Sequence, residues 1–240
     1  MIDLSIADVA TRFPDFRVAV LLFKSNGIPL QRTRRIEDYV AETMQICRAQ
    51  WNGTELSAIP GVAAWRRAYK GFGIKSTSYR SSVERLVKRV LAGDEIPRIN
   101  AFVDLYNAVS LAYVLCLGAD DLDRVQDPIN ADLAFRFARE GDSFIDMAPA
   151  EGSPAEQPPK SGEVVYAAGS TVLCRRWNWR QDARSVVGAQ TRRIVLTIQS
   201  NGEGSVEAAA EALNALAASE LAMTCSISFA DSAHPRVQLS

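Results

Sequence analysis

The residues best suited to chemistry form one short stretch in the second half of the chain. Residues 174–182 contain three arginines, two tryptophans, a cysteine, an asparagine, a glutamine and an aspartate. Arginine binds anions through a planar guanidinium group, and an indole ring stacks on bases or on guanidinium planes. The stretch follows the apolar run Val164–Ala168, which is typical of a buried strand. Two interpretations are open: a recognition site for an anionic or aromatic ligand, or a surface strand with solvated arginines and tryptophans that cover the core edge.

A second set of polar side chains lies in the mostly apolar segment 101–111, which is predicted to be a helix. Asp104, Asn107 and Ser110 recur at three-residue spacing and so share one strip of that helix. Buried polar groups need hydrogen-bond partners. The strip therefore either caps neighbouring loops or forms the floor of a site.

Charge is distributed unevenly along the chain. The net charge is -1 over 240 residues, which argues against non-specific polyanion binding by the chain as a whole. Basic side chains concentrate in residues 65–100 and again in 175–193, with an acidic region at 120–146 between them. If the two basic blocks meet in space, they form a positive face suited to a nucleic-acid backbone. If they do not meet, they are ordinary solvated surfaces.

The composition argues against several classes of site. Cys47, Cys116, Cys174 and Cys225 form no CxxC pair, and His234 is the only histidine, so we expect no metal, no cofactor and no serine or cysteine catalytic triad. We expect Cys47 and Cys116 on apolar helix faces and Cys225 in a strand, all as free thiols. The start of the chain has no signal-peptide pattern and no apolar run reaches ~18 residues, so a cytoplasmic protein without membrane contact is expected.

Periodicity and turn signals predict interspersed strands and helices in a single α+β (mixed α/β) domain over residues 1–240. A capping box at Ser81–Glu84 begins one helix. Segment 131–138 is expected to pair with 143–147 as a hairpin, and 149–162 is expected to be a flexible excursion. The strands are predicted at 18–23, 131–138, 164–168, 193–198 and 223–229, and the helices at 36–51, 62–70, 82–91, 101 to near 118, and 206–221.

Two segments taken together resemble the B3/B4 domain of the phenylalanyl-tRNA synthetase β subunit. Residues 98–107, read as Arg-Ile-Asn-Ala-Phe-Val-Asp-Leu-Tyr-Asn and followed by Leu122-Asp123, are similar to its asparagine-containing lead into a Val-Asp-x-x-Asn helix. Residues 162–182 resemble the strand and turn that complete the same pocket. The resemblance covers about 59–200, with elaborations at both ends. It implies a barrel-like mixed sheet flanked by helices.

In the synthetase this domain edits mischarged aminoacyl-tRNA, so the resemblance implies a free-standing RNA-binding hydrolase that acts on aminoacyl-tRNA in trans. Such ester hydrolysis needs a positioned water rather than a protein nucleophile. By analogy, Asn100, Asn107 and Asn178 would hold the water and the ester carbonyl. The substrate-binding residues would be Asp104, Tyr106, Cys174, Arg176, Trp177, Trp179 and Arg180, with Arg176 and Arg180 on the terminal phosphates and Trp177 or Trp179 stacked on the terminal adenine.

One departure from the synthetase pattern bears on specificity. The synthetase domain inspects the amino-acid side chain with a glutamate, whereas residues 175–178 of this chain are Arg-Arg-Trp-Asn. Its amino-acid specificity therefore does not carry over. The alternatives are a non-catalytic module that holds tRNA or an amino-acid-like ligand in the same pocket, and a small-molecule enzyme that has reused it.

Overall fold

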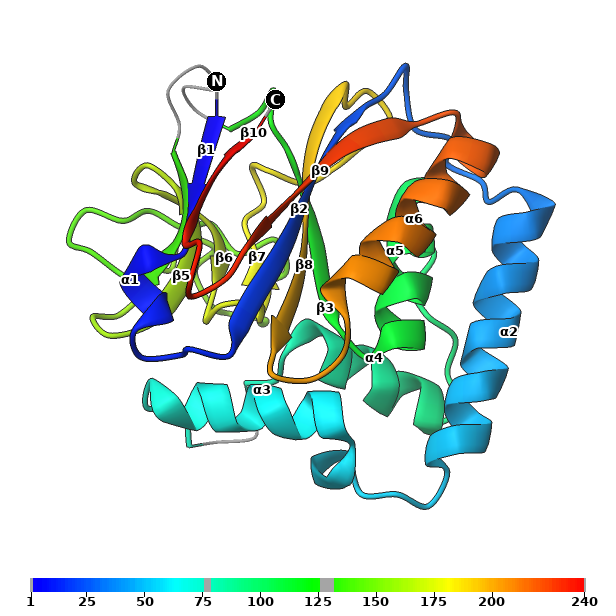
Figure 1. Cartoon of the computed structure of the whole chain (residues 1–240), viewed down its shortest axis with the longest axis horizontal. Helices are drawn as coiled ribbons and strands as arrows, with labels where there is room; N and C mark the ends of the chain where they lie inside the picture. Colours follow the sequence, from blue (N-terminus) through cyan, green and yellow to red (C-terminus); the bar gives the residue numbers. More distant parts are fainter. Residues whose placement is uncertain (1, 76–78, 126–131, 240) are drawn as a thin grey trace.

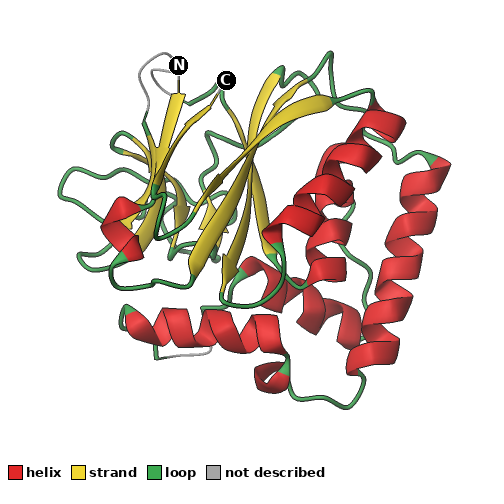
Figure 2. Cartoon of the chain, viewed as in Figure 1, coloured by secondary structure: helices red, strands yellow, loops and turns green. Residues whose placement is uncertain are grey.

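Two β-sheets pack against each other, and helices cover the other face of one of them (Figures 1 and 2). The computed structural model describes residues 2–75, 79–125 and 132–239. The predicted α+β class is confirmed. Over these residues neither sheet closes into a barrel, so the architecture is two open sheets rather than a barrel.

The helix-covered sheet has the strand order β3-β8-β2-β9, and all its neighbours are antiparallel. Its central strands are almost wholly buried because one face packs on helices and the other on the second sheet, which is why they read as continuous apolar runs. The strands predicted at 18–23, 193–198 and 223–229 are confirmed. The bounds are β2 Phe16–Lys24, β3 Cys116–Asp121, β8 Arg193–Asn201 and β9 Thr224–Ala230.

The prediction of a helix that continues to about Gly118 is wrong, because residues 116–121 form the strand β3. Helix α5 (Ala101–Tyr113) ends where Val114 adopts a left-handed φ of 52°, and the chain then enters β3. Cys116 is therefore a strand residue, not a helix residue. Periodicity does not mark this boundary, because both elements are buried and apolar at the junction.

The second sheet has the order β10-β1-β4-β5-β6-β7, with β1 and β4 parallel and the other neighbours antiparallel. The predicted strands at 131–138 and 164–168 are confirmed as β4 and β5, although Ala131 lies outside the described residues. The predicted hairpin is wrong, because β4 pairs with β5 and 143–147 forms only isolated bridges. The bounds are β1 Ile2–Ser5, β4 Leu133–Phe137, β5 Val164–Ala168, β6 Thr171–Arg175, β7 Arg180–Gln181 and β10 Arg236–Leu239.

The helices form a layer on the β3-β8-β2-β9 sheet and close one end of the molecule (Figure 1). Helices α5 and α6 (Val206–Leu221) lie against the sheet, and α2 (Arg34–Trp51) packs outside α5. Helix α5 is buried nearly all round because it is the middle of these layers. The remaining elements are α1 Ala7–Ala10, the 3-10 helix Leu56–Ala58, α3 Pro60–Gly71 and α4 Ser82–Leu91.

The helices predicted at 36–51, 62–70, 82–91 and 206–221 are confirmed, and the cap predicted at Ser81 is present. The Ser81 hydroxyl accepts a hydrogen bond from the Glu84 amide at 3.4 Å, as the capping box requires. The Glu84 carboxylate, however, binds Arg66 and Arg80 at 2.7 and 3.0 Å instead of turning back to Ser81. None of the helices in the described residues combines the length and apolar character needed to cross a membrane.

Candidate functional site

A cavity of about 380 Å³ lies where the two sheets meet helices α4 and α5. Its lining comes from α4, α5 and the residues just before α5, from β3 and β8 of one sheet, and from β5, β6 and β7 of the other. The volume is typical of small-ligand sites. Because both sheets contribute, residues far apart in the sequence come together here.

The two sequence stretches face each other across this cavity. Tyr106 and Asn107 line it from α5, and Cys174 lines it from β6. The turn and strand that follow add the side chains of Asn178, Trp179 and Arg180.

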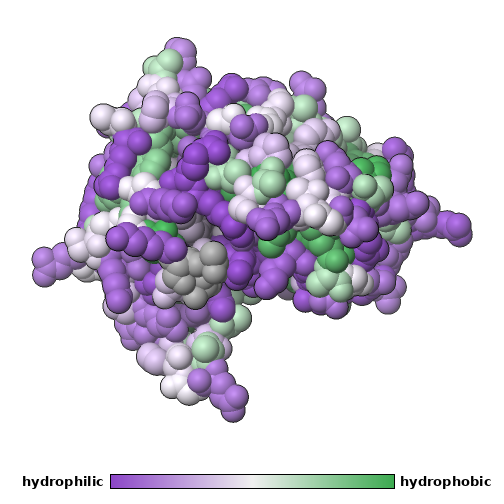
Figure 3. Space-filling model, turned by 90° about the horizontal axis from the view of Figure 1, so that it is seen from below, coloured by the Kyte–Doolittle hydropathy of each residue, from purple (hydrophilic) through white to green (hydrophobic). Residues whose placement is uncertain are grey.

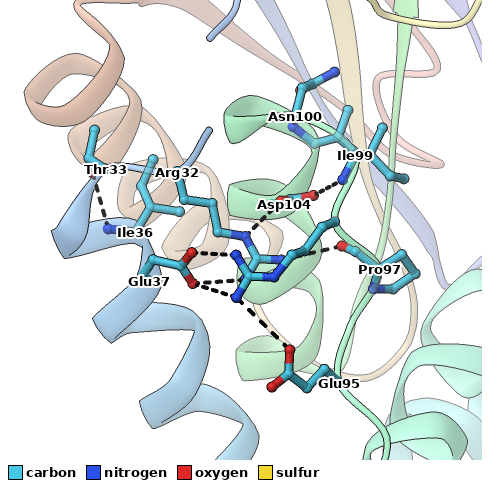
Figure 4. Close-up of polar contacts among 11 residues, drawn as sticks. Arg32, Thr33, Ile36, Glu37, Glu95, Pro97, Ile99, Asn100 and Asp104 are labelled. Carbon is cyan, nitrogen blue, oxygen red and sulfur yellow. Dashed lines mark hydrogen bonds and ion pairs between the residues drawn. The ribbon is translucent and has the colours of Figure 1, made fainter. Parts of the chain in front are cut away.

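Asn100 and Asp104 do not line the cavity; they hold the segment that does (Figure 4). Asn100 caps α5 by accepting from the Val103 amide at 2.9 Å, and its Nδ2 donates to the Val187 carbonyl at 3.3 Å. Asp104 accepts from the Ile99 amide at 2.9 Å and from Arg32 Nε at 2.7 Å. These bonds fix residues 97–99, whose Pro97 and Ile99 line the cavity.

Asp104 and Arg32 form a buried ion pair that α2 helps to complete. Their side chains are 2% and 3% exposed, and Glu37 of α2 adds a contact to the Arg32 guanidinium at 3.2 Å. A buried charge is tolerated when its partner and hydrogen bonds are in place. The predicted polar strip of α5 is therefore divided: Asp104 faces Arg32, Ser110 donates to the Leu115 carbonyl at 2.6 Å, and Asn107 faces the cavity.

Trp177 lies in the core and not in the cavity wall. It is fully buried, with ring centroids 4.8 Å from those of Phe13 and Phe16 and 5.3 Å from that of Trp65. Trp177 and its neighbour Arg176 both adopt a positive φ, 68° and 46°, in the turn between β6 and β7. This turn directs the indole of Trp177 inward and leaves Trp179 at the cavity.

Arg176 stands behind the cavity wall and supports it. Its guanidinium lies 3.8 Å from the ring centroid of Tyr79 and 4.4 Å from that of Trp179, and it pairs with Glu163 at 3.2 Å. A guanidinium held between two rings is stabilised by cation–π attraction. With these contacts made, Arg176 positions Trp179 and Tyr79 and has no face on the cavity.

Several polar groups in the cavity have no partner among the described residues. The Tyr166 hydroxyl is buried without a hydrogen bond, and burial raises the pKa of Tyr166 well above its usual value, so the hydroxyl is a neutral donor. The Asn107 amide also makes no hydrogen bond within the described structure. Asn178, in contrast, accepts from the Tyr69 hydroxyl at 2.9 Å and donates to Gln199 at 3.1 Å.

Asp120, near the end of β3, is a cavity carboxyl whose pKa is strongly raised, and the sequence does not single it out. Burial raises the pKa of Asp120 from 3.8 to about 7, even though hydrogen bonds from Ser185 and Gln181 oppose the rise. Both bonds, at 2.6 and 2.9 Å, go to Oδ1, and no described donor contacts Oδ2. A carboxyl that titrates near neutrality can exchange a proton at pH 7.

The sequence holds only a weak signal for Asp120. It is one of many acidic residues in the region 120–146, and its neighbour Asp121 instead accepts from the Thr191 hydroxyl at 2.5 Å, away from the cavity. The feature that could have indicated Asp120 is its position directly after an apolar run. Such a run is typical of a buried strand, and polar residues at the end of a strand often lie at the edge of the sheet.

Cations from both basic blocks of the sequence meet at this cavity. Arg85 and Arg89 of α4 line it together with Arg180 of β7. Arg85 Nη1 donates to the Trp179 carbonyl at 3.2 Å, while Arg180 binds Asp146 at 3.2 Å and the Ala148 carbonyl. The alternative of two unrelated solvated faces does not apply to these three arginines.

Cys174 lines the cavity as a protonated thiol. Burial raises the pKa of Cys174 far above its usual range, with a further rise from the nearby Asp120 charge. A thiol without thiolate character is a poor nucleophile. Across the described ranges, no three histidine, cysteine or acidic side chains gather as a metal site would require.

A family model of the B3/4 domain matches residues 64–223, a span that includes every side chain lining the cavity. The chain belongs to the B3/4 domain family. This confirms the resemblance found in the sequence, and the B3/4 match leaves β1, β2, α2, β9 and β10 outside its bounds.

A similar solved structure is a crystal structure of an N-terminal fragment of the phenylalanyl-tRNA synthetase β subunit from Pyrococcus horikoshii. It aligns with a TM-score of 0.38 and 12% sequence identity, over 52% of this chain and 40% of that chain. The B3/4 protein described here thus spans less than half of that fragment. A search of curated proteins found no match to the present chain.

Proposed function

We propose that this B3/4 protein binds the aminoacylated 3′ end of a tRNA in the cavity and hydrolyses the aminoacyl ester in trans. A tRNA-related role is supported by family membership together with the resemblance to the editing domain of a tRNA synthetase. The finer claim of hydrolysis rests on one observation. A carboxyl with a pKa of about 7 and one oxygen without a described donor lines a cavity that also holds unpartnered hydrogen-bond donors.

The proposed reaction is addition of water to the ester carbonyl. Ionised Asp120 takes a proton from the water through Oδ2, and the water oxygen forms a bond to the carbonyl carbon. The oxyanion that develops is stabilised by donors such as the Asn107 amide and the Tyr166 hydroxyl. Protonated Asp120 then returns its proton to the departing ribose oxygen, which releases a free amino acid and a tRNA with a free terminal hydroxyl.

The remaining cavity residues are proposed to bind the end of the RNA. Trp179 offers an indole face for the terminal adenine, and base–aromatic stacking contributes about 1–3 kcal/mol per base. Arg180, with Arg85 and Arg89, offers cationic donors for the adjacent phosphates. Asn178 is proposed to shape the cavity floor through its bonds to Tyr69 and Gln199.

The test is a deacylation screen of the purified protein against aminoacyl-tRNAs, one amino acid at a time. We expect hydrolysis above the spontaneous rate on at least one of them, with kcat rising with pH through about 7 as Asp120 ionises. Asp120→Asn should lower kcat by about 10²–10⁴-fold, the usual contribution of a general base.

Asp121→Asn is the matched control, because it removes the neighbouring carboxylate, which does not line the cavity. It should leave kcat close to that of the parent protein. Absence of hydrolysis on every aminoacyl-tRNA would refute the proposal, and so would an equal effect of the two variants.

A second candidate function is binding without hydrolysis. It is favoured by the same pKa: near pH 7 a large share of Asp120 is protonated, and a protonated carboxyl is a hydrogen-bond donor rather than a base. Retained affinity for aminoacyl-tRNA in a protein that leaves the ester intact would select this alternative.

A further inference from the structure

A second basic depression lies beside the cavity, on the other side of an aromatic ridge. It measures about 400 Å³ and is lined mainly by α3 and, between α3 and α4, by Ile74, Lys75, Tyr79 and Ser81. Its cations are Arg66, Arg67, Lys70 and Lys75. We call it the α3 groove.

Most of the positive charge in the α3 groove is uncompensated. The carboxylate that lines it, Glu84, is already bound to Arg66 and Arg80 at 2.7 and 3.0 Å. Arg67, Lys70 and Lys75 are exposed, and no described residue forms an ion pair with any of them. Viewed from the side on which α3 lies, the surface is largely hydrophilic in its left half (Figure 3).

The α3 groove and the cavity are adjacent. Tyr79 lines the groove, Trp179 lines the cavity, and their ring centroids are 5.1 Å apart at an interplanar angle of 89°. The successive residues Ser81 and Ser82 likewise line the groove and the cavity. The ridge between the two depressions therefore includes the Tyr79 and Trp179 rings.

The ridge is fixed in place from within. Arg176 lies within 3.8 Å of the Tyr79 ring centroid and 4.4 Å of the Trp179 ring centroid, and its buried pairing with Glu163 anchors it to the strand β5 region. An RNA strand that leaves the cavity over Trp179 thus crosses two rings that stand nearly perpendicular to each other, and it reaches the three cations that no described residue pairs with. Alternating aromatic and cationic surfaces are what a single-stranded nucleic acid needs, since bases stack and phosphates pair with cations.

We propose that the α3 groove binds the phosphodiester backbone of the RNA that leads into the cavity. This inference rests on the proposed function, since it extends the binding site for the 3′ end away from the ester. Arg67, Lys70 and Lys75 neutralise backbone phosphates. Bases of the RNA stack on Tyr79 and Trp179 where the strand passes over the ridge. Affinity for tRNA then comes largely from the α3 groove, whereas the chemistry stays in the cavity.

The test uses the full chain with Arg67, Lys70 and Lys75 all replaced by alanine. Binding of uncharged tRNA is measured by fluorescence anisotropy over a range of salt concentrations. Each lost phosphate contact lowers the salt slope by about one unit, so the triple variant should show a slope smaller by about 2–3 units. Its affinity at low salt should fall by about tenfold or more.

A control variant removes the same charge from elsewhere on the surface. Lys24, Arg34 and Lys88 are exposed and line neither depression. Replacing all three with alanine should leave the salt slope within about one unit of the parent value. Equal losses in the two triple variants, or no loss in the α3-groove variant, would overturn the assignment.

A second measurement separates the groove from the cavity. The parent protein and the α3-groove variant are compared on aminoacyl-tRNA and on the same amino acid esterified to a 3′-terminal trinucleotide. The variant should lose kcat/KM on the tRNA and retain it on the short ester; an equal loss on both would overturn the groove. If the parent protein hydrolyses neither substrate, the proposed reaction fails, and the anisotropy experiment still decides the groove.

Discussion

The two walls of the cavity divide structural and site-facing residues in different ways. On α5 the division follows helix rotation: Asp104 faces Arg32, whereas Tyr106 and Asn107 face the cavity. In the β6–β7 turn the division falls between neighbours, because the positive φ of Arg176 and Trp177 redirects successive side chains. In both walls, some residues of the predicted site line the cavity, and the others hold those residues in place.

The left-handed turn carries a conformational cost that the core offsets. A residue other than glycine in this region costs roughly 1–2 kcal/mol, and here two such residues follow each other. Full burial of the Trp177 ring and the contacts of Arg176 with Glu163, Tyr79 and Trp179 hold the turn. The α5 wall needs no such strain, since its period alone separates the two roles.

The largest expected effect on stability is that of replacing Trp177 in the β6–β7 wall. Trp177→Ala should lower the free energy of unfolding by about 3–5 kcal/mol, because it opens a cavity among Phe13, Phe16 and Trp65. Trp179→Ala, two residues away, should cost much less stability and mainly weaken tRNA binding. Urea denaturation and tRNA anisotropy on both variants test this, and equal losses of stability would show that the two indoles do not have different roles.

On the α5 wall, the matching test compares Asp104 with Asn107. Among the described residues, Asp104→Ala leaves Arg32 buried with only Glu37 and the Pro97 carbonyl as partners. The substitution should therefore lower the free energy of unfolding by about 3 kcal/mol. Asn107→Ala should leave stability nearly unchanged and reduce hydrolysis. A stable Asp104→Ala protein with normal unfolding would mean that the buried pair does not hold this wall.

Asp120, which lines the cavity from β3, should make the stability of the protein depend on pH. Burial raises the folded-state pKa of Asp120 to about 7, above its ordinary value of 3.8. Between these two values the folded protein holds a proton that the unfolded chain has lost, so Asp120 makes stability fall as pH rises from about 4 to about 7. Asp120→Asn should remove this slope and stabilise the protein at pH 8, as thermal unfolding across the pH range will show.

One outcome of the same experiment would contradict this prediction. Parallel stability curves for the parent and Asp120→Asn proteins between pH 4 and 8 would mean that Asp120 titrates as an ordinary exposed carboxyl. The proposed pH dependence of hydrolysis would then lose its basis.

The smallest expected effect concerns Cys174, which sits at the start of the β6–β7 wall. Burial raises its pKa, so the thiol stays protonated at neutral pH. Cys174→Ala should therefore retain hydrolysis within a few-fold of the parent protein, measured as kcat on the best aminoacyl-tRNA. A loss as large as that of Asp120→Asn would instead make Cys174 the nucleophile.

Much of the fold could be predicted from local pattern. Continuous apolar runs marked β2, β5 and β8. Periodicity marked α2, a capping box marked α4 and alanine content marked α6, because each of these signals depends only on near neighbours. The start of β3 was missed because a buried helix and a buried strand have the same apolar sequence. The pairing of β4 with β5 was missed because 26 residues lie between Phe137 of β4 and Val164 of β5, and no local signal spans that loop.

The candidate site was predictable in outline only. The sequence resemblance brought α5 and residues 174–182 together as two walls, and the structure places Tyr106, Asn107, Cys174, Asn178, Trp179 and Arg180 at one cavity. Asp120 gave no comparable signal, because its raised pKa comes from burial between two sheets. The adjacency of the α3 groove also depends on tertiary contact between Tyr79 and Trp179, 100 positions apart.

The sequence by itself determined the family, most of the elements and the existence of an arginine- and tryptophan-rich recognition stretch, since these follow from residue types and short-range spacing. Only the tertiary structure decided which members of that stretch face the ligand. The reason is physical: side-chain direction depends on the backbone conformation of the β6–β7 turn, and the acidity of Asp120 depends on the solvent that two packed sheets exclude. Neither the side-chain direction nor the pKa of Asp120 can be predicted from the local sequence.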